Sequence, residues 1–302
     1  MSGRVMGPFE SCEVRVAATG LRFPEGPVAC DDGSVLVVEI EGGTLARVGH
    51  DGTFGVVAAC GGGPNGAAFG PDGAVYVNND GGLAFTTEDG IRFPHELAEG
   101  NDGGCVQRVD PATGEVEVVF THCEGERIGS LNDIVFDETG HCYVVDTTRG
   151  ALYYADPVAR SIRHAALGLS FPNGMGLSPD GRRLYVSETY SGRLVAFDVD
   201  APGVLGPAVE LYATGGEHGW DGLAVDGAGN VCAANLQRSG ITVVSPGGDV
   251  LGAFVTPEPD PYVTNICFGG PGGDTAYVCS SGRGVLYALR WPWPGLRLHF
   301  AG

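Results

Sequence analysis

The chain has 302 residues, with 17 basic and 37 acidic side chains and a formal net charge of −20 at pH 7. All of the basic residues are arginines. This acidic balance argues against nucleic acid as a partner, because phosphate binding needs a basic stripe, and against an anionic membrane surface. Charged residues make up only 18% of the chain and apolar residues 43%, so the composition is not that of a disordered acidic protein.

Neither a targeting segment nor a disulfide framework is expected. No stretch approaches 18 consecutive apolar residues, and the first ten residues hold one arginine and no apolar core, so we predict no membrane span and no signal peptide. Nine cysteines without a C-x-x-C pair fit neither a zinc site nor a secreted disulfide protein. We expect most of them to be small buried hydrophobes in a reducing compartment, and the protein to be cytoplasmic.

One sequence unit recurs along the whole chain. It consists of a polar residue, an apolar strand, a turn containing glycine and a second apolar strand with a polar end. Six copies begin, 40 to 67 residues apart, at Glu25, Asn65, Asn132, Asn173, Asp221 and Asn265. Each copy has the composition of a β-hairpin, and a period of about 40–50 residues is typical of propeller blades. Glycine (52) and proline (19) are frequent enough to supply the many turns that short strands require.

The repeat predicts an all-β fold, a six-bladed β-propeller with four-stranded blades. We expect residues 1–302 to form a single domain, with blade hairpins starting near 25, 65, 132, 173, 221 and 265. Strand-like segments between the hairpins would complete each blade. A strand near residues 13–17 is expected to pair with the last blade, because an open sheet edge invites aggregation. The long insertion at residues 80–104 is expected to act as a lid or as a passive cover.

The first strand of each propeller blade lines the central channel, so the first residues of the six units should form one polar ring. The polar ends of the second strands should reach the same mouth of the channel: Glu39, Asn79, Asp146, Glu188, Asn235 and Ser280. A single Asn or Asp before Gly is ordinary turn chemistry. Six oxygen-bearing side chains at one repeat position favour a hard divalent cation, which would also relieve the repulsion between carboxylates.

The motifs FPEGP, LNDIVFD, FPNGMGLSPDG, WDGLAVD and VTNICFGG together resemble the SMP-30/gluconolactonase/luciferin-regenerating-enzyme-like family, over roughly residues 16–290. The resemblance implies a six-bladed propeller with one metal in the channel, held by Glu25, Asn173 and Asp221. It further implies that Asn132 either binds the metal or contacts substrate. Asn65 and Asn265 are interpreted as lying beside the metal or facing the substrate. Ca²⁺ is the expected ion, with Zn²⁺, Mg²⁺ and Mn²⁺ as alternatives.

The expected activity is metal-dependent hydrolysis of a small-molecule lactone, in which the cation polarises the carbonyl and a carboxylate assists attack by water. The base is either Asp221 or Asp133, and the sequence does not decide between them. His218 and Phe93 are further candidate substrate contacts. Members of the family that hydrolyse sugar lactones often carry Arg at the position of Ser130, which argues against a gluconolactone-like substrate.

Two alternatives to a lactonase stay open at this point. One is another metal-dependent reaction on the same scaffold: phosphotriester cleavage, dehydration of a sugar acid or a biosynthetic step. The other is a binding propeller without catalysis. The chain has no GxSxG motif, which disfavours a serine hydrolase. It is expected to be a monomer or a small homo-oligomer.

Overall fold

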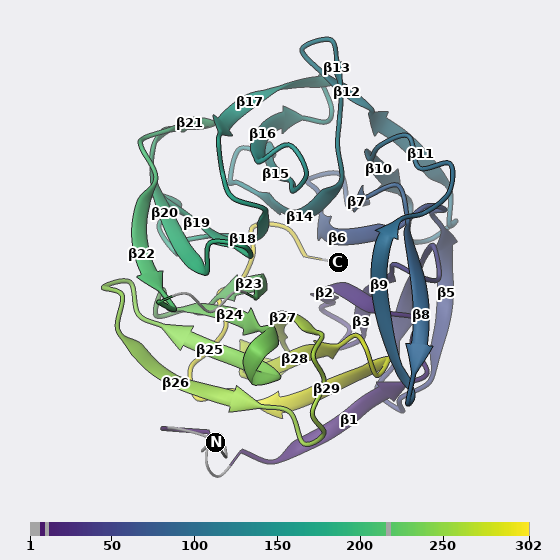
Figure 1. Ribbon diagram of the computed structural model, residues 1–302, viewed down its shortest axis with the longest axis vertical. Coiled ribbons are helices and arrows are strands. Elements are labelled where there is room, and N and C mark those ends of the chain that lie inside the picture. The colour runs from purple at the N-terminus through teal and green to yellow at the C-terminus, as the bar shows by residue number, and fades with distance from the viewer. Residues whose placement is uncertain (1–6, 10–11, 216–218, 302) are drawn as a thin grey trace.

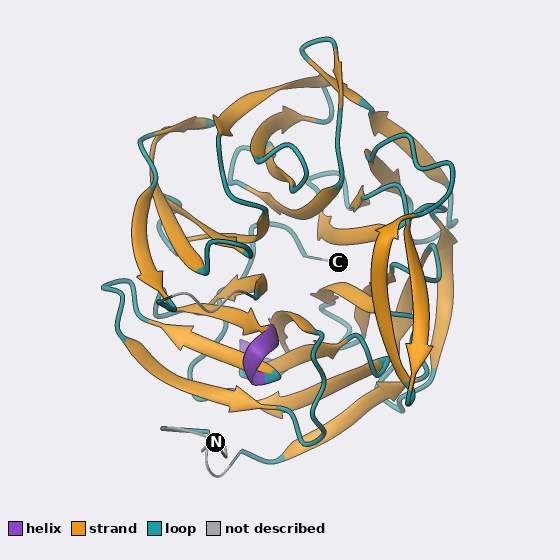
Figure 2. Ribbon diagram, viewed as in Figure 1, coloured by secondary structure: helices purple, strands orange, loops and turns teal. Residues whose placement is uncertain are grey.

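A computed structural model describes residues 7–9, 12–215 and 219–301. Six antiparallel sheets surround a central axis, as the repeat predicted (Figure 1). Strands dominate the molecule (Figure 2), and its 3-10 turns include η1 (Leu236–Arg238) and η2 (Pro271–Gly273). The all-β class and the six-bladed propeller are therefore confirmed. No helix in these described ranges has the length and apolar character needed to cross a membrane.

Blades 1 to 3 follow one another along the chain. Blade 1 contains β2 (Pro24–Ala29), β3 (Val35–Glu39), β4 (Thr44–Val48) and β5 (Phe54–Ala59). Blade 2 contains β6 (Pro64–Phe69), β7 (Val75–Asn79), β10 (Cys105–Val109) and β11 (Val116–Phe120). Blade 3 contains β14 (Leu131–Phe136), β15 (Cys142–Asp146), β16 (Ala151–Asp156) and β17 (Ser161–Leu167).

Blades 4 to 6 complete the circle. Blade 4 contains β18 (Pro172–Leu177), β19 (Arg183–Glu188), β20 (Arg193–Ala201) and β22 (Val209–Ala213). Blade 5 contains β23 (Trp220–Val225), β24 (Val231–Asn235), β25 (Gly240–Val244) and β26 (Val250–Val255). Blade 6 contains β27 (Val263–Gly269), β28 (Thr275–Ser280), β29 (Val285–Arg290) and β1 (Val14–Thr19).

The ring closes because the first strand of the chain joins the last blade. Strand β1 pairs antiparallel with β29, with Val14 opposite Leu289 and Thr19 opposite Val285. The predicted closing strand is thus confirmed, and it removes the free edge that β29 would otherwise present.

Three additions depart from a regular propeller. Strand β21 (Val204–Leu205) pairs with β20, so the sheet of blade 4 has five strands rather than the expected four. A hairpin of β8 (Leu83–Glu88) and β9 (Ile91–Leu97) is inserted within blade 2. A short hairpin of β12 (His122–Cys123) and β13 (Glu126–Arg127) follows blade 2.

Hydrophobic cores lie between neighbouring blades. The rings of Tyr76 in blade 2 and Phe136 in blade 3 are 5.2 Å apart. Trp220, at the start of blade 5, is only 1% exposed. Its Nε1 donates a hydrogen bond of 2.9 Å to the carbonyl of Gly192 next to blade 4. This tryptophan therefore joins blades 4 and 5.

The innermost strands β2, β6, β14, β18, β23 and β27 form a closed ring in which each contacts the next. Glycine permits this approach. A Cβ on Gly66 would lie 2.4 Å from the carbonyl oxygen of Asn132, and one on Gly174 would lie 2.5 Å from the amide nitrogen of Leu223. The glycine that follows the polar residue in several repeat copies thus has a steric origin, because inner strands pack backbone to backbone around the axis.

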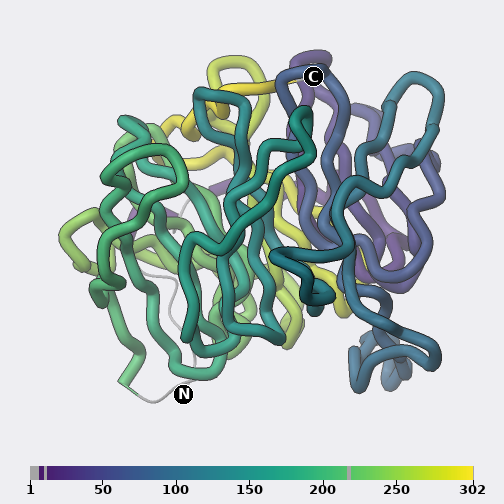
Figure 3. Tube along the Cα trace, turned by 90° about the horizontal axis from the view of Figure 1, so that it is seen from above, coloured from purple at the N-terminus to yellow at the C-terminus, as the bar shows by residue number. Residues whose placement is uncertain are grey.

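The two faces of the propeller differ. The β8–β9 hairpin and the C-terminus lie on opposite faces (Figure 3). On the C-terminal face the inner strands and residues 295–301 line a cavity of about 940 Å³, and Asp133 and Asn265 are among its lining residues. The opposite face holds the loops that lead into the inner strands, and it is the mouth that the sequence predicted to be polar.

Candidate functional site

A β-bulge interrupts all six inner strands at the position of the predicted polar ring. The register shifts lie between Glu25 and Val28, Pro64 and Gly66, Leu131 and Ile134, Pro172 and Met175, Trp220 and Leu223, and Val263 and Asn265. Bulges re-aim side chains and are frequent beside active sites. The common bulge therefore explains how residues from six distant segments turn towards one axis.

Glu25, Asp133 and Asn265 form the best-defined part of the site. The Asn265 Nδ2 donates one hydrogen bond of 2.9 Å to Glu25 Oε2 and another of 3.1 Å to Asp133 Oδ1. Its Oδ1 accepts a bond of 2.8 Å from the amide of Ile266. Both polar atoms of the Asn265 carboxamide are thus engaged, and this residue holds the carboxylates of blades 1 and 3 beside each other.

Both carboxylate oxygens of Asp133 accept hydrogen bonds from other blades. Its Oδ2 accepts a hydrogen bond of 3.2 Å from the amide of Met175 in the neighbouring blade. Burial, followed by repulsion from Glu25, raises the pKa of Asp133 to about 8. In several other copies, glycine follows the ring residue. Asp133 instead adds a carboxylate at this position in blade 3.

Asp221 and Asn173 complete the cluster from blades 5 and 4. Burial and then the charges of Glu25 and Asp133 raise the pKa of Asp221 well above its usual range, while a hydrogen bond from Asn173 lowers it. Asp221 lies on the inner strand β23 and is partly exposed to solvent. The buried Asn173 Oδ1 has no hydrogen-bonding partner among the described residues.

The other predicted ring residues are also buried. Asn132 is 9% exposed. The Oδ1 of Asn65 is buried without a partner in the described part of the chain. His218 lies outside the described residues. The structure thus brings Glu25, Asp133, Asn173, Asp221 and Asn265 together and leaves two amide oxygens unpaired.

The predicted second ring has a different role. Glu39 accepts from the Arg22 amide and the Thr44 hydroxyl, both at 2.7 Å. Asp146 accepts from the Gly129 amide at 2.7 Å, and Glu188 accepts from Arg193 at 2.6 Å. These carboxylates therefore anchor loops within their own blades and offer no free ligand set. Sequence position alone did not distinguish them from the first ring.

Two supporting residues escaped the sequence analysis. Asn78 Nδ2 donates a hydrogen bond of 2.9 Å to the carbonyl of Asp133, and Ser187 Oγ donates one of 2.6 Å to the carbonyl of Asp221. Both residues occupy the penultimate position of a second strand, where blades 1, 3, 5 and 6 have Val, Val, Ala and Cys. A polar residue at a repeat position that is otherwise apolar was the available signal. Asn78 and Ser187 fix the backbone of two candidate site residues.

Aromatic side chains of the β8–β9 hairpin lie over the strands that enter the site. Phe85 packs on Phe23 with ring centroids 5.1 Å apart, and Phe93 packs edge-on against Tyr262 at 5.8 Å. Phe23 lies two residues before Glu25, and Tyr262 three before Asn265. Arg92 ties the hairpin down, because its Nε lies 2.8 Å from the Glu41 carboxylate. Phe93 is thus near the entrance to the site rather than among the acidic groups.

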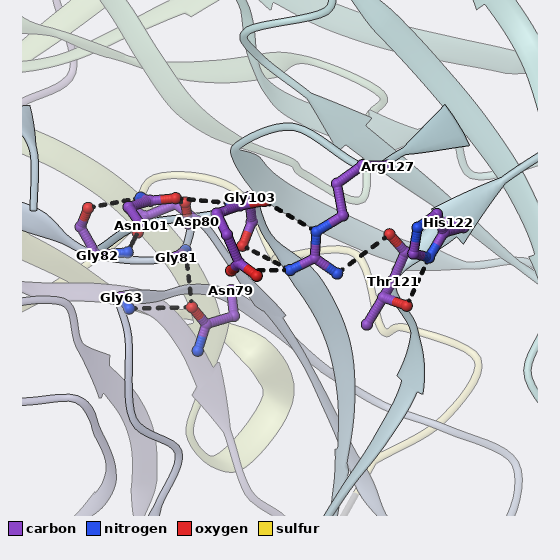
Figure 4. A network of polar contacts seen from close by, with 11 residues as sticks. Gly63, Asn79, Asp80, Gly81, Gly82, Asn101, Gly103, Thr121, His122 and Arg127 are labelled. Carbon is purple, nitrogen blue, oxygen red and sulfur yellow. Dashed lines mark hydrogen bonds and ion pairs between the residues drawn. The ribbon is translucent and has the colours of Figure 1, made fainter. Parts of the chain in front are cut away.

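A network of polar contacts fixes both ends of the inserted segment (Figure 4). Asn79 Oδ1 accepts from the amides of Gly63 and Gly81 at 3.0 and 2.9 Å. Asn101 Nδ2 donates 2.8 Å to the carbonyl of Gly82. Arg127 donates from Nη2 to the Asp102 carboxylate at 3.0 Å. Arg127 therefore braces the insertion and does not replace the arginine that many sugar lactonases carry at the position of Ser130.

The same network contains a buried carboxyl group, Asp80. Its Oδ1 accepts 2.6 Å from the Gly82 amide, and its buried Oδ2 has no partner among the described residues. Burial raises the pKa of Asp80 to about 7. Because the folded protein holds this proton more tightly than the unfolded chain, the contribution of Asp80 to stability is lost as the pH rises towards and through 7.

Asp80→Asn is therefore expected to raise the free energy of unfolding at about pH 8 by about 2 kcal/mol and to leave it little changed at about pH 4. Urea unfolding at the two pH values measures the effect. Asp249→Asn, at an exposed turn, is the control and should change neither value. If Asp80→Asn destabilises the protein equally at both pH values, ionisation of the Asp80 carboxyl group does not lower the free energy of unfolding.

The axial cluster fits a hard divalent cation. Glu25, Asp133 and Asp221 form no ion pair with the described basic residues, and Asn173 Oδ1 is an unpaired buried acceptor. The three carboxylates do not fall into a group with ligand atoms within 4.8 Å of one another among the described residues. Ca²⁺ is bound by carboxylate and amide oxygens at 2.3–2.6 Å, and these are the donor types that the cluster offers.

Gluconolactonases are found both among the sequence relatives of this chain and among the solved structures that resemble it. A gluconolactonase of Zymomonas mobilis is 26% identical over 308 aligned positions, which cover 90% of this chain and 80% of that protein. A solved structure of XC5397, a gluconolactonase from Xanthomonas campestris, superposes with a TM-score of 0.78 at 20% identity and covers 96% of this chain and 94% of that one.

A further solved structure is that of regucalcin, a calcium-binding protein from Agrobacterium tumefaciens, with a TM-score of 0.72 at 18% identity, covering 95% of this chain and 98% of that one. At these identities the two structures support the fold. Residues 23–282, from the FPEGP motif to the end of the last blade hairpin, match the SMP-30/Gluconolactonase/LRE-like region. The chain therefore belongs to the SMP-30/gluconolactonase/luciferin-regenerating-enzyme-like family.

Proposed function

We propose that this protein is a divalent-metal-dependent lactonase whose site is the axial cluster. The observation that carries the proposal is a set of buried carboxylates without a cationic side chain beside them, next to the unpaired oxygen of Asn173. Buried charges are costly unless they are paired or bind a metal. The gluconolactonase relative supports lactone hydrolysis as the reaction.

Glu25, Asn173, Asp221 and Asn132 are the proposed metal ligands. Their oxygen atoms favour Ca²⁺, with Mg²⁺, Mn²⁺ and Zn²⁺ as alternatives, and the calcium-binding regucalcin neighbour agrees with this order. When bound, the cation would polarise the lactone carbonyl and stabilise the negative charge that develops on its oxygen.

Asp221 is the proposed general base. Both oxygens of Asp133 are engaged, by Asn265 and by the Met175 amide, whereas Asp221 retains accessible surface. Asp221 would take a proton from water as the oxygen of that water bonds to the carbonyl carbon. The ester C–O bond then breaks, and the proton passes to the departing ring oxygen. Asp133 is assigned a positioning role, because its carboxylate holds strands of three blades together.

Substrate contacts are assigned to the groups around the entrance. Asn132 and Asn65 are the proposed hydrogen-bonding contacts of the substrate, and the Oδ1 of Asn65 has no partner in the described part of the chain. Phe93 and Tyr262 would form an aromatic wall beside the entrance. Ser130 and the engaged Arg127 leave no arginine at the position used for sugar hydroxyl groups. We therefore propose a lactone that depends less on hydroxyl recognition than gluconolactone does.

The remaining assignments follow from the closed ring and the cysteines. We propose that residues 1–302 form one domain. All nine cysteines are free thiols. Free thiols are typical of a reducing compartment, so we propose a cytoplasmic location.

The test combines metal removal with a substrate panel. Protein treated with a chelator should lose lactone hydrolysis and regain it when Ca²⁺ is restored, because the cation supplies several kcal/mol of stabilisation in the transition state. Sugar lactones, aliphatic lactones and phosphotriesters are then offered to the metal-loaded protein. If the rate of lactone hydrolysis is unchanged by the chelator, the proposed metal dependence is wrong. Turnover of phosphotriesters without any lactone would favour the alternative reaction.

A further inference from the structure

Outside the channel, the described residues contain one group of three possible metal-ligating side chains of mixed chemistry: Cys123, Glu124 and His164. Cys123 and Glu124 belong to the β12–β13 hairpin, and His164 lies on β17, the outer strand of blade 3. The β12 and β17 strands are in contact. The group therefore joins the segment that leaves blade 2 to the outer edge of blade 3.

The three ligand atoms surround one point. Cys123 Sγ lies 3.9 Å from His164 Nδ1, and Glu124 Oε2 lies 3.0 Å from the same nitrogen. All three atoms lie within 4.8 Å of one another. A catalytic relay of cysteine, histidine and carboxylate would use both ring nitrogens. Here the sulfur and the oxygen approach the same nitrogen, so the group is not such a relay. Glu124 and His164 form a hydrogen bond, which an ion bound between the three atoms would replace.

The distances agree with tetrahedral coordination of zinc. Zn–S of about 2.3 Å and Zn–N of about 2.0 Å place sulfur and nitrogen about 3.6 Å apart at the tetrahedral angle, and the corresponding N···O distance is about 3.4 Å. The observed separations differ from these values by 0.3 to 0.4 Å, which small side-chain rotations can absorb. The thiolate and imidazole ligands favour Zn²⁺ and disfavour Ca²⁺.

Solvent can reach the group of three side chains, and a neighbouring ring packs against its histidine. The side chains of Glu124 and His164 are 57% and 27% exposed, while Cys123 is 2% exposed. An ion could thus enter from solvent and reach a sheltered sulfur. The ring of the buried Tyr153 packs against His164 at 5.2 Å between centroids. Because three protein ligands are available, the fourth tetrahedral position would be left to water.

We propose that Cys123, Glu124 and His164 form a zinc-binding site, separate from the axial site, which links the β12–β13 hairpin to β17. The site goes beyond the proposed lactonase activity and does not depend on it. Binding of zinc to the folded chain would stabilise the attachment of this hairpin to blade 3, since an ion that binds only the folded state raises its stability.

The experiment uses Co²⁺ as a spectroscopic probe of the metal-depleted full-length protein. We expect one equivalent to produce thiolate-to-cobalt charge-transfer absorption together with tetrahedral ligand-field bands, and Zn²⁺ to abolish both. Cys123→Ser should remove the charge-transfer band and lower Zn²⁺ affinity by at least about 100-fold. His164→Gln and Glu124→Gln, at the exposed side of the group, should weaken binding without loss of the fold, as checked by circular dichroism.

Two controls locate the signal. Cys105→Ser removes a partly exposed thiol on β10 of blade 2 and should leave the band intact. Asp221→Asn alters the axial cluster and should also leave it intact, so failure of the lactonase proposal and failure of the zinc proposal are distinguishable. Absence of a charge-transfer band at one equivalent of Co²⁺, or a band that survives in Cys123→Ser, overturns the proposal.

Discussion

Asp221→Asn is expected to lower kcat/KM for lactones by about 10³-fold or more, because it weakens a proposed metal ligand and removes the proposed base together. The change preserves the shape of the side chain, and the Ser187 bond goes to the backbone carbonyl of residue 221, so the fold should be retained. Steady-state kinetics at several Ca²⁺ concentrations, with calorimetric measurement of Ca²⁺ affinity, check both effects.

Asp249→Asn is a matched control, since it removes an exposed carboxylate in blade 5 and should leave kinetics and affinity unchanged. The fold of Asp221→Asn is verified by its melting temperature. Wild-type kcat/KM in a folded Asp221→Asn protein would exclude this aspartate from both the metal site and the base role.

Gly66→Ala is expected to destabilise the protein by about 3 kcal/mol or more, which is large for a single methyl group. A Cβ at this position would lie 2.4 Å from the carbonyl oxygen of Asn132 and 2.8 Å from the Cα of Asp133. Both atoms are backbone, so blades 2 and 3 would have to separate. Urea unfolding measures the loss.

Gly55→Ala supplies the comparison. Gly55 also lies on a strand of the propeller, but on the outer strand β5, where a Cβ would meet nothing within 4 Å. It should change stability by no more than about 0.5 kcal/mol. Similar effects of the two substitutions would show that backbone contact between inner strands is not what requires glycine at Gly66.

Much of the architecture was readable before any coordinates, since each blade hairpin repeats the same local pattern. A turn with glycine between two apolar strands depends on neighbours along the chain, and six copies make the pattern unmistakable. The closing strand was expected because an open sheet edge invites aggregation, and β1 does pair with β29. The extra strand β21 was not predicted, because a two-residue strand carries no periodic signal.

The functional site could be predicted from the sequence only in part. The resemblance singled out Glu25, Asn173 and Asp221, and the structure brings all three to the axis. The structure also shows that Asn265 donates hydrogen bonds to both Glu25 and Asp133. No local pattern indicates these bonds, because the partners are 240 and 132 residues away along the chain. The carboxylates of Glu39, Asp146 and Glu188 looked equivalent to the first ring until their hydrogen bonds to nearby loops were seen.

Sequence alone therefore determined the class of fold and the number of blades, because hydrophobic alternation and turn chemistry act over a few residues. Tertiary structure decided which oxygens remain without partners, how the bulges aim them, and that Cys123 and Glu124 meet His164 across two blades. Those outcomes depend on distances between segments that are far apart in the chain, and only the packing of the blades around the axis sets such distances.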